Sequence, residues 1–265
     1  MKADFHMHTS FSTDSETSPE KMIERAIELG LQKICITDHE DLDFPEEGFV
    51  VDFETYFEQL PKLQEKYKDQ IEVRIGVELG LQTHLGERLQ KIVDTYPFDF
   101  VLGSVHVLDG TDPHCGKYFQ NRTDEEGYRE AFEHTLNNIR TIQCFDVLGH
   151  MDYVVRYGHQ KAASYSYKKY ADIIDEVLRT LIAQGKGIEL NTAGLKYGIG
   201  FAHPHSDVLK RYRELGGEII TVGSDGHRPE HLAYEFGIAK QILLDSGFKY
   251  YTDFCQRKPE FCAIL

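Results

Sequence analysis

The chain has 265 residues with a formal net charge of −15, and 41% of them are hydrophobic, as in globular proteins with a sizeable core. Such acidity argues against nucleic acid or an anionic membrane as a stable partner, because both are negative themselves. No apolar run reaches the roughly 18 residues that span a bilayer, and the N-terminus lacks the apolar core of a signal peptide.

Seven short runs rich in β-branched and aromatic residues predict strands. The runs are mostly apolar on both faces, as parallel strands covered by helices are. In chain order they are 3–6, 33–37, 72–77, 98–102, 145–148, 187–190 and 218–222. The run 248–251 is a weaker candidate for an eighth strand.

Helix signals separate these strands. Ser18 followed by Pro19 predicts an N-cap, and Gly30 predicts the end of that first helix. Thr123 and Glu126 predict a capping box at the start of a helix that runs to about residue 143. Further helices are expected at 54–68, 85–94, 167–184, 206–215 and 230–246. Seven alternations of strand and helix predict the α/β class and a closed or nearly closed barrel.

The cysteines and the absence of linkers bear on compartment and domain count. Five cysteines are scattered without a CxxC pair, at positions 35, 115, 144, 255 and 262. An odd, scattered set is typical of reduced thiols, so we expect a cytoplasmic protein. No low-complexity stretch, repeat or linker divides the chain, so residues 1–265 are expected to form a single domain.

Polar residues follow directly after the strands. They are side chains that can bind a metal or form hydrogen bonds: His6, His8, Asp38, His39, Glu78, His106, His150, Asn191, Asp225 and His227. In a barrel the carboxyl ends of the strands converge on one face, where active sites lie. His6 and His8 alternate with period two, so both point the same way in an extended segment. Burying so many unpaired imidazoles and carboxylates would be costly, and a metal centre removes that cost.

Other polar residues have simpler interpretations. A lone histidine near a strand end is more often a hydrogen-bonded structural residue than a ligand. His203 and His205 precede a predicted helix, so we expect both to be loop residues beside an N-cap at Ser206. His84 and Asp152 are candidates for a general acid. Asp38 is expected to orient an imidazole, as carboxylates beside metal sites do.

Together these motifs resemble the PHP superfamily of polymerases and histidinol phosphatases. The resemblance rests on segments that appear in order: 4–14, 36–39, 76–78, 103–106, 149–152 and 224–227. The segments 150–156 and 189–196 are similar to those of the stand-alone L-histidinol-phosphate phosphatases of histidine biosynthesis. That branch usually has arginine and serine where this chain has Lys196 and Ala193. The resemblance implies a distorted seven-stranded (β/α)7 TIM-like barrel.

The resemblance also implies three divalent metal ions at the carboxyl ends of the strands. The implied ligands are His6, His8, Glu78 and Asp225 for one ion, Glu78, His106 and His150 for a second, and Asp14, His39 and His227 for the third. Imidazoles and carboxylates without thiolates suit zinc, manganese or ferrous iron. Glu78, Asp225 and His227 are the expected catalytic residues.

The implied chemistry is hydrolysis of a phosphate monoester by a metal-bridging hydroxide. Three divalent ions outweigh three carboxylates and a hydroxide, so the pocket is cationic and suits a small phosphorylated metabolite better than a long polyanion. Arg156, whose planar guanidinium can bind two phosphate oxygens, Lys196 and Asn191 are the expected substrate contacts.

The expected function is therefore that of an L-histidinol-phosphate phosphatase, which releases histidinol and phosphate. One alternative is another phosphoesterase of the same superfamily that acts on nucleotides or oligonucleotide ends. A further alternative is a non-catalytic metal-binding domain. The complete set of ligand-competent residues argues against a domain that has lost catalysis.

Overall fold

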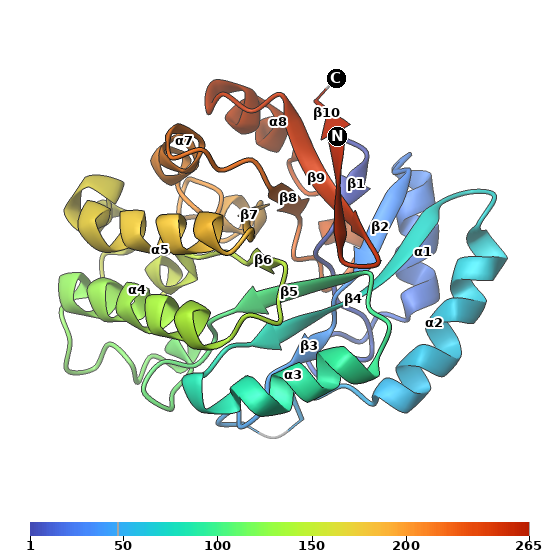
Figure 1. Ribbon diagram of the computed structural model, residues 1–265, viewed down its shortest axis with the longest axis horizontal. Helices are drawn as coiled ribbons and strands as arrows, with labels where there is room; N and C mark the ends of the chain where they lie inside the picture. The colour runs from blue at the N-terminus through green and yellow to red at the C-terminus, as the bar shows by residue number, and fades with distance from the viewer. Residues whose placement is uncertain (47, 265) are drawn as a thin grey trace.

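The computed structural model describes residues 1–46 and 48–264. Parallel strands form the expected nearly closed barrel, with helices around it (Figure 1). In spatial order the strands are β1 (Ala3–Asp4), β2 (Lys33–Ile36), β4 (Glu72–Gly80), β5 (Phe100–Ser104), β6 (Val147–Leu148), β7 (Gly187–Asn191) and β8 (Ile220–Gly223). The short β3 (His39–Glu40) follows β2 and pairs with β4. The predicted fold class is confirmed.

The barrel closes between its first and last strands. Phe5 N–H donates to the carbonyl of Val222, and His8 N–H donates to the carbonyl of Gly226, both at 2.9 Å. These bonds lie just beyond the regular part of β1, so the chain continues alongside β8 as far as His8. The two polar segments that end these strands are thereby held side by side.

Helices surround the barrel, with α4 and α5 on one side and α1 and α2 on the other (Figure 1). Their bounds are α1 (Pro19–Glu28), α2 (Phe53–Tyr67), α3 (Gly86–Thr95), α4 (Asp124–Thr141), α5 (Ala171–Ala183), α6 (Ala193–Lys196), α7 (Ser206–Glu214) and α8 (Phe236–Asp245). The predicted cap at Ser18 and the capping box at Thr123 are confirmed. The N-cap of α7 is His205, so the prediction of Ser206 is wrong by one residue.

Two predicted helices begin later than expected. Residues 167–170 and 229–231 form short 3-10 turns ahead of α5 and α8. Tertiary contacts decide such boundaries, since periodicity alone does not separate a 3-10 turn from the first turn of an α-helix.

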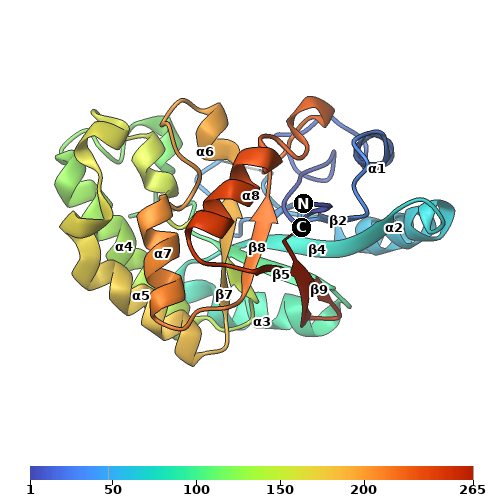
Figure 2. The same ribbon diagram turned by 90° about the horizontal axis from the view of Figure 1, so that it is seen from above.

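The C-terminal segment lies outside the barrel. It forms an antiparallel hairpin of β9 (Tyr250–Cys255) and β10 (Lys258–Ala263). Asp253 pairs with Lys33, at the start of β2, at 2.8 Å, and Arg257 pairs with Asp146, just ahead of β6. The hairpin therefore covers the amino ends of the strands, and both views place the two chain termini close together (Figure 2). The candidate eighth strand is a strand of this hairpin and not of the barrel.

The barrel interior is a packed core. Phe5 and Phe100 are buried inside it with their rings in edge-to-face contact, 5.6 Å between centroids. With one end covered by the hairpin and the interior filled, the polar side chains at the carboxyl ends are left as the open face. Among the described residues, no helix is long and apolar enough to cross a membrane.

Candidate active site

A cavity of about 730 Å³ opens at the carboxyl ends of the strands. Most of the expected metal ligands line it: Asp14, His39, Glu78, His106, His150, Asp225 and His227. His6 and His8 are fully buried, and each lies within 4 Å of both Glu78 and Asp225. The structure thus brings all nine expected ligands together from separate strand ends and the first loop.

Glu78 stands at the centre of this group, at the end of β4. Its Oε1 lies 3.0 Å from Nε2 of His150 and 3.3 Å from Nε2 of His106. Its Oε2 lies 3.2 Å from Nε2 of His6 and 3.2 Å from Nδ1 of His39. Oε2 is buried and has no hydrogen-bond partner in the described part of the chain. Nε2 of His8 lies 3.5 Å from the same oxygen. A carboxylate set between five imidazoles in this way is suited to bridging two cations.

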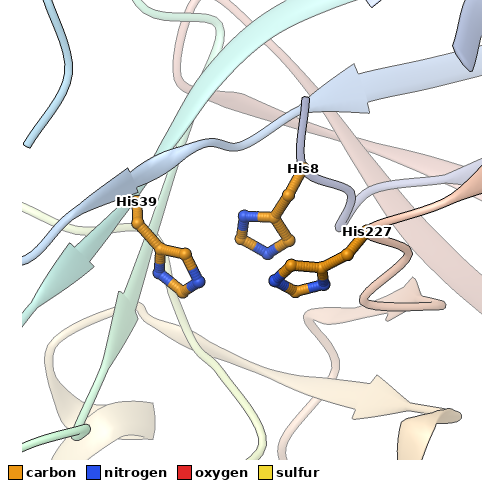
Figure 3. A group of neighbouring side chains, drawn as sticks. All are labelled: His8, His39 and His227. Carbon is orange, nitrogen blue, oxygen red and sulfur yellow. The ribbon is translucent and has the colours of Figure 1, made fainter. Parts of the chain in front are cut away.

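The imidazoles of His8, His39 and His227 converge on one another (Figure 3), and the first two also lie within 4 Å of Glu78. The ring of His8 lies 4.2 Å from that of His39 and 4.1 Å from that of His227, measured between centroids. One ring nitrogen of each lies within 4.8 Å of the others. Asp14 contacts Nε2 of His227 at 2.9 Å and Nε2 of His39 at 3.7 Å. Stacked imidazoles repel one another when protonated, so the group fits a metal cation better than several protons.

Burial and neighbouring charges shift the pKa values of these side chains. Burial, together with His227 and His39, lowers the pKa of His8 to about 3, so the neutral ring keeps one nitrogen lone pair free to coordinate. Burial alone would lower the pKa of His39, but the charges of Glu78, Asp41 and Asp14 raise it to about 9. Without a metal, protons on imidazoles such as His39 neutralise the carboxylates. A metal cation would displace those protons.

The pKa of Glu78 shows the same balance from the carboxylate side. Burial alone would raise it, but the neighbouring His6, His106 and His39 outweigh burial and hold the pKa well below its usual range. The carboxylate therefore stays ionised although it is fully buried. It can offer both oxygens to cations.

Two carboxylates that the sequence analysis did not assign orient the imidazoles. Asp41 lies 2.9 Å from Nδ1 of His106 and 3.0 Å from Nδ1 of His39. Glu189 lies 2.7 Å from Nδ1 of His6 and accepts a hydrogen bond from the backbone N–H of His150. For His6 and His106, a carboxylate on Nδ1 leaves Nε2 free for a metal, the arrangement usual for metal-binding histidines. Two features of the sequence could have identified these carboxylates. Asp41 follows His39 by two residues, and Glu189 is the one acidic residue inside an apolar predicted strand.

The end of β8 approaches its neighbours through unusual backbone. Asp225 has a φ of 52°, in the left-handed region that residues other than glycine seldom adopt. A Cβ atom added at Gly223 would lie 2.3 Å from the Cβ of His6 and 2.3 Å from Oε1 of Glu189. Glycine at 223 therefore permits the close approach that puts Asp225 beside His6 and His8.

Asp38 differs from its expected role. Its carboxylate accepts hydrogen bonds from the backbone N–H of Thr9 at 2.6 Å and from the hydroxyl of Ser12 at 2.8 Å. Ser12 in turn contacts Nδ1 of His8 at 3.3 Å and accepts from the backbone N–H of His39. Asp38 thus holds the first loop and affects the imidazoles through Ser12, without touching a ring itself.

The candidates for a general acid have other partners. Asp152 is fully buried, where it contacts Nδ1 of His203 at 2.5 Å and accepts from the backbone N–H of His205. His203 lies in a loop before α7, as expected, and it is fully buried there. His84 is exposed, contacts Asp43 at 3.1 Å and does not line the site cavity.

The three expected substrate contacts lie in different surroundings. Arg156 is the last residue of the 3-10 turn Tyr153–Arg156, which follows β6, and it lines the cavity. Lys196 is half-buried beside it, and among the described residues its ammonium has no hydrogen-bond partner. The side-chain amide of Asn191 is buried and donates to Glu189 at 3.2 Å and to Asp225 at 3.5 Å. Asn191 thus supports the ligand group from behind instead of lining the cavity.

Comparisons with known proteins agree with this geometry. The family model of the PHP domain matches residues 4–193. A histidinol-phosphatase of Lactococcus lactis subsp. lactis is 32% identical over 263 residues, covering 97% of this chain and 96% of the relative. A probable histidinol-phosphatase of Clostridium acetobutylicum is 35% identical over 253 residues, covering 94% of this chain and 95% of that protein.

Solved structures extend the similarity to three dimensions. The crystal structure of the Lactococcus lactis histidinol phosphate phosphatase, complexed with zinc, L-histidinol and phosphate, superposes with a TM-score of 0.91 over 98% of both chains, at 32% identity. A putative histidinol phosphatase of Listeria monocytogenes shares the fold, with a TM-score of 0.75 at 18% identity, over 89% of this chain and 99% of that one. The barrel, its polar face and these matches together place the chain in the PHP domain family.

Proposed function

We propose that this protein hydrolyses L-histidinol phosphate to L-histidinol and orthophosphate. The observation that carries the proposal is the buried carboxylate of Glu78, contacted by five imidazoles, in the same cavity as Arg156. A metal-binding group beside an arginine suits hydrolysis of a phosphate monoester. Similarity over nearly the full length to histidinol-phosphatases supports the choice of substrate.

The proposed cofactor is a set of three divalent ions, zinc, manganese or ferrous iron. The residues fit such ions because buried nitrogens and oxygens converge in several overlapping groups. In addition, Oε2 of Glu78 has no hydrogen-bond partner among the described residues. When bound, such ions acidify a water molecule and neutralise charge that develops on the phosphoryl group. Glu78 would hold two ions together, Asp225 would join the group of His6 and His8, and His227 that of Asp14 and His39.

The metal content of the purified protein is expected to reach two to three equivalents of divalent transition metal. The reason is that eight of the nine expected ligands, all but Asp14, form several overlapping groups among the described residues, more than one ion can occupy. Elemental analysis of protein prepared with added metal measures this directly. A metal-free preparation that keeps its full phosphatase activity after chelation would contradict the prediction.

The cavity lining combines two kinds of chemistry. It includes the cationic side chains of Arg156, Lys161 and Arg228. It also includes Phe44 and Phe49, whose rings lie 4.5 Å apart, and the carboxylates of Glu46 and Asp112. Histidinol phosphate has a phosphate at one end and an ammonium and an imidazole at the other. The cationic side chains suit the phosphate, and the aromatic and acidic side chains suit the aminoimidazole end.

Replacing Asp112 with asparagine is expected to reduce discrimination in favour of histidinol phosphate. The substitution keeps the side-chain shape and the hydrogen bond from the backbone of His114 but removes the charge that faces the cavity. The ratio of kcat/KM for histidinol phosphate to that for p-nitrophenyl phosphate should fall about 5-fold, since partly exposed charge pairs contribute ~1 kcal/mol. Glu87→Gln, on the exposed face of α3, is the matched control. An unchanged ratio would remove Asp112 from substrate recognition.

Phosphate release by the metal-replete protein tests the proposed function. Histidinol phosphate should be hydrolysed with a higher kcat/KM than a dinucleotide, a 3′,5′-bisphosphate or p-nitrophenyl phosphate. Preference for a nucleotide substrate would support the alternative of a nucleotide phosphoesterase. A metal-loaded protein that hydrolyses none of them would support a non-catalytic domain.

The proposal extends to the organisation and location of the chain. Residues 1–265 are proposed to form one PHP-type metallophosphatase domain, because the C-terminal hairpin packs on the amino ends of the barrel strands. A cytoplasmic location is proposed from the cysteines, all five of which are free thiols.

A further inference from the structure

Arg156 lies among the faces of three tyrosine rings. Its guanidinium carbon lies 3.7 Å from the ring centroid of Tyr197, 5.1 Å from that of Tyr153 and 5.6 Å from that of Tyr157. Distances of up to about 6 Å are those of cation–π contacts, and the shortest of the three is tight stacking. We call these three residues the tyrosine sleeve.

Arg156 also differs from other half-buried arginines of the chain in its lack of an acidic partner. Among the residues that the structure describes, no carboxylate forms an ion pair with Arg156. Other half-buried arginines do have such partners: Arg211 pairs with Asp175, and Arg257 pairs with Asp146. A guanidinium held by its faces keeps the N–H donors at its edge for a ligand, whereas an ion pair would occupy some of them.

The sleeve is also joined to the proposed metal centre. The ring of Tyr153 lies 5.1 Å from that of His150 and 5.8 Å from that of His106. The hydroxyl of Tyr157 donates to the hydroxyl of Tyr153 at 2.9 Å. Tyr197 reaches Arg156 from a different segment, directly after α6. The guanidinium is therefore fixed relative to the imidazoles by rings from two separate parts of the chain.

We infer that Tyr153, Tyr157 and Tyr197 are positioning residues that hold the guanidinium of Arg156 ready for a phosphoryl group. The inference rests on the proposed function only in that the ligand carries a phosphoryl group. Stacking fixes the plane of the guanidinium before the ligand arrives, which lowers the entropy lost on binding. Tyr197 is the most informative member, because it is 48% exposed and makes the shortest contact.

The first test measures phosphate affinity in the metal-replete protein. Tyr197→Ala should weaken the binding of orthophosphate, followed by calorimetry, by about 5- to 30-fold, the range expected when a partly desolvated cation–π contact is lost. Tyr197→Phe keeps the ring and should bind phosphate like the wild type. The KM for p-nitrophenyl phosphate should rise in parallel while kcat changes less. Equal phosphate affinity in wild type and Tyr197→Ala would overturn the inference.

Chemical rescue separates positioning from a general structural role. In Arg156→Ala the sleeve should still accept free ethylguanidinium, which restores part of the phosphate affinity, whereas ethylammonium of the same charge should not. Adding Tyr197→Ala to this variant should raise the half-saturating ethylguanidinium concentration by about 5- to 30-fold. Rescue that is equally strong with ethylammonium, or that does not depend on Tyr197, would show that the rings do not hold the guanidinium.

These readouts also separate the sleeve from the identity of the substrate. Orthophosphate and p-nitrophenyl phosphate contain no histidinol. A protein that ignores histidinol phosphate but shows ring-dependent rescue would contradict the proposed substrate and support the sleeve. A protein that hydrolyses histidinol phosphate without ring-dependent rescue would do the reverse.

Discussion

Glu78→Gln is expected to lose nearly all phosphatase activity together with bound metal. The amide keeps the size of the side chain but removes the charge that faces five imidazoles and the cations proposed between them. Removing one partner of a buried charge pair costs about 3–5 kcal/mol. If that loss appears in kcat/KM, it corresponds to about 150- to 5,000-fold.

The comparison with Asp14 identifies the bridging carboxylate. Asp14 is 38% exposed at its side chain, and its ion-pair contacts among the described residues are with His39 and His227. Asp14→Asn should therefore lose less activity than Glu78→Gln. Steady-state kinetics and elemental analysis are made at equal folded protein, checked by circular dichroism, with Glu87→Gln as the control. If Asp14→Asn is as damaging, Glu78 is not the bridge or the third ion is the catalytic one.

Arg156→Ala is expected to lower kcat/KM for histidinol phosphate by about 30- to 1,000-fold. The substitution removes a charge-assisted contact that can bind two phosphate oxygens in a partly dry cavity, worth about 2–4 kcal/mol. Metal content should not change, because Arg156 is not a ligand. Arg179→Ala, on an exposed face of α5, is the control for the loss of a positive charge.

Lys196 offers a graded comparison with Arg156. Its ammonium is buried without a hydrogen-bond partner among the described residues and lies near Asp225 and Arg156. Lys196→Ala should lower kcat/KM for histidinol phosphate less than Arg156→Ala does, because an ammonium on a flexible side chain makes a single, less directional contact. Lys196→Arg should retain or improve activity. A near-wild-type kcat/KM for Arg156→Ala would remove Arg156 from the site and weaken the assignment of the substrate.

Local sequence patterns predicted the elements and the ligand group. Strand runs, the N-cap at Ser18 and the capping box at Thr123 are properties of a few neighbouring residues, so they can be read without the fold. Eight of the nine ligand candidates could be read because they follow the strands, and all parallel strands of a barrel end on one face. Asp14, in the first loop, was expected only from the resemblance to the PHP superfamily. His6 and His8 are two residues apart, and in an extended segment this spacing puts both side chains on the same side of the backbone.

Only the tertiary structure decided which partner each side chain meets. Glu189 lies 183 residues from His6 in the chain, yet contacts it because the barrel closes, and no local pattern encodes that pairing. The sequence predicts His203 only as a loop residue, and it is the fold that buries it against Asp152. Asp41 likewise acquires its role only when β3 and β5 bring His39 and His106 to either side of it.

The surroundings of Arg156 also depend on contacts between distant segments. Residue type, place in the chain and the resemblance to the PHP superfamily together predicted Arg156 after the β6 segment and Lys196 after the β7 segment as phosphate contacts, and this stays a prediction. The tyrosine sleeve forms only because Tyr197, which is 41 residues from Arg156 in the sequence, contacts it from another loop. The hairpin of β9 and β10 likewise packs on the amino ends of strands that belong to distant segments. Contacts between distant segments form only when the core has packed, so the sequence determined which residues are available and the tertiary structure decided what they face.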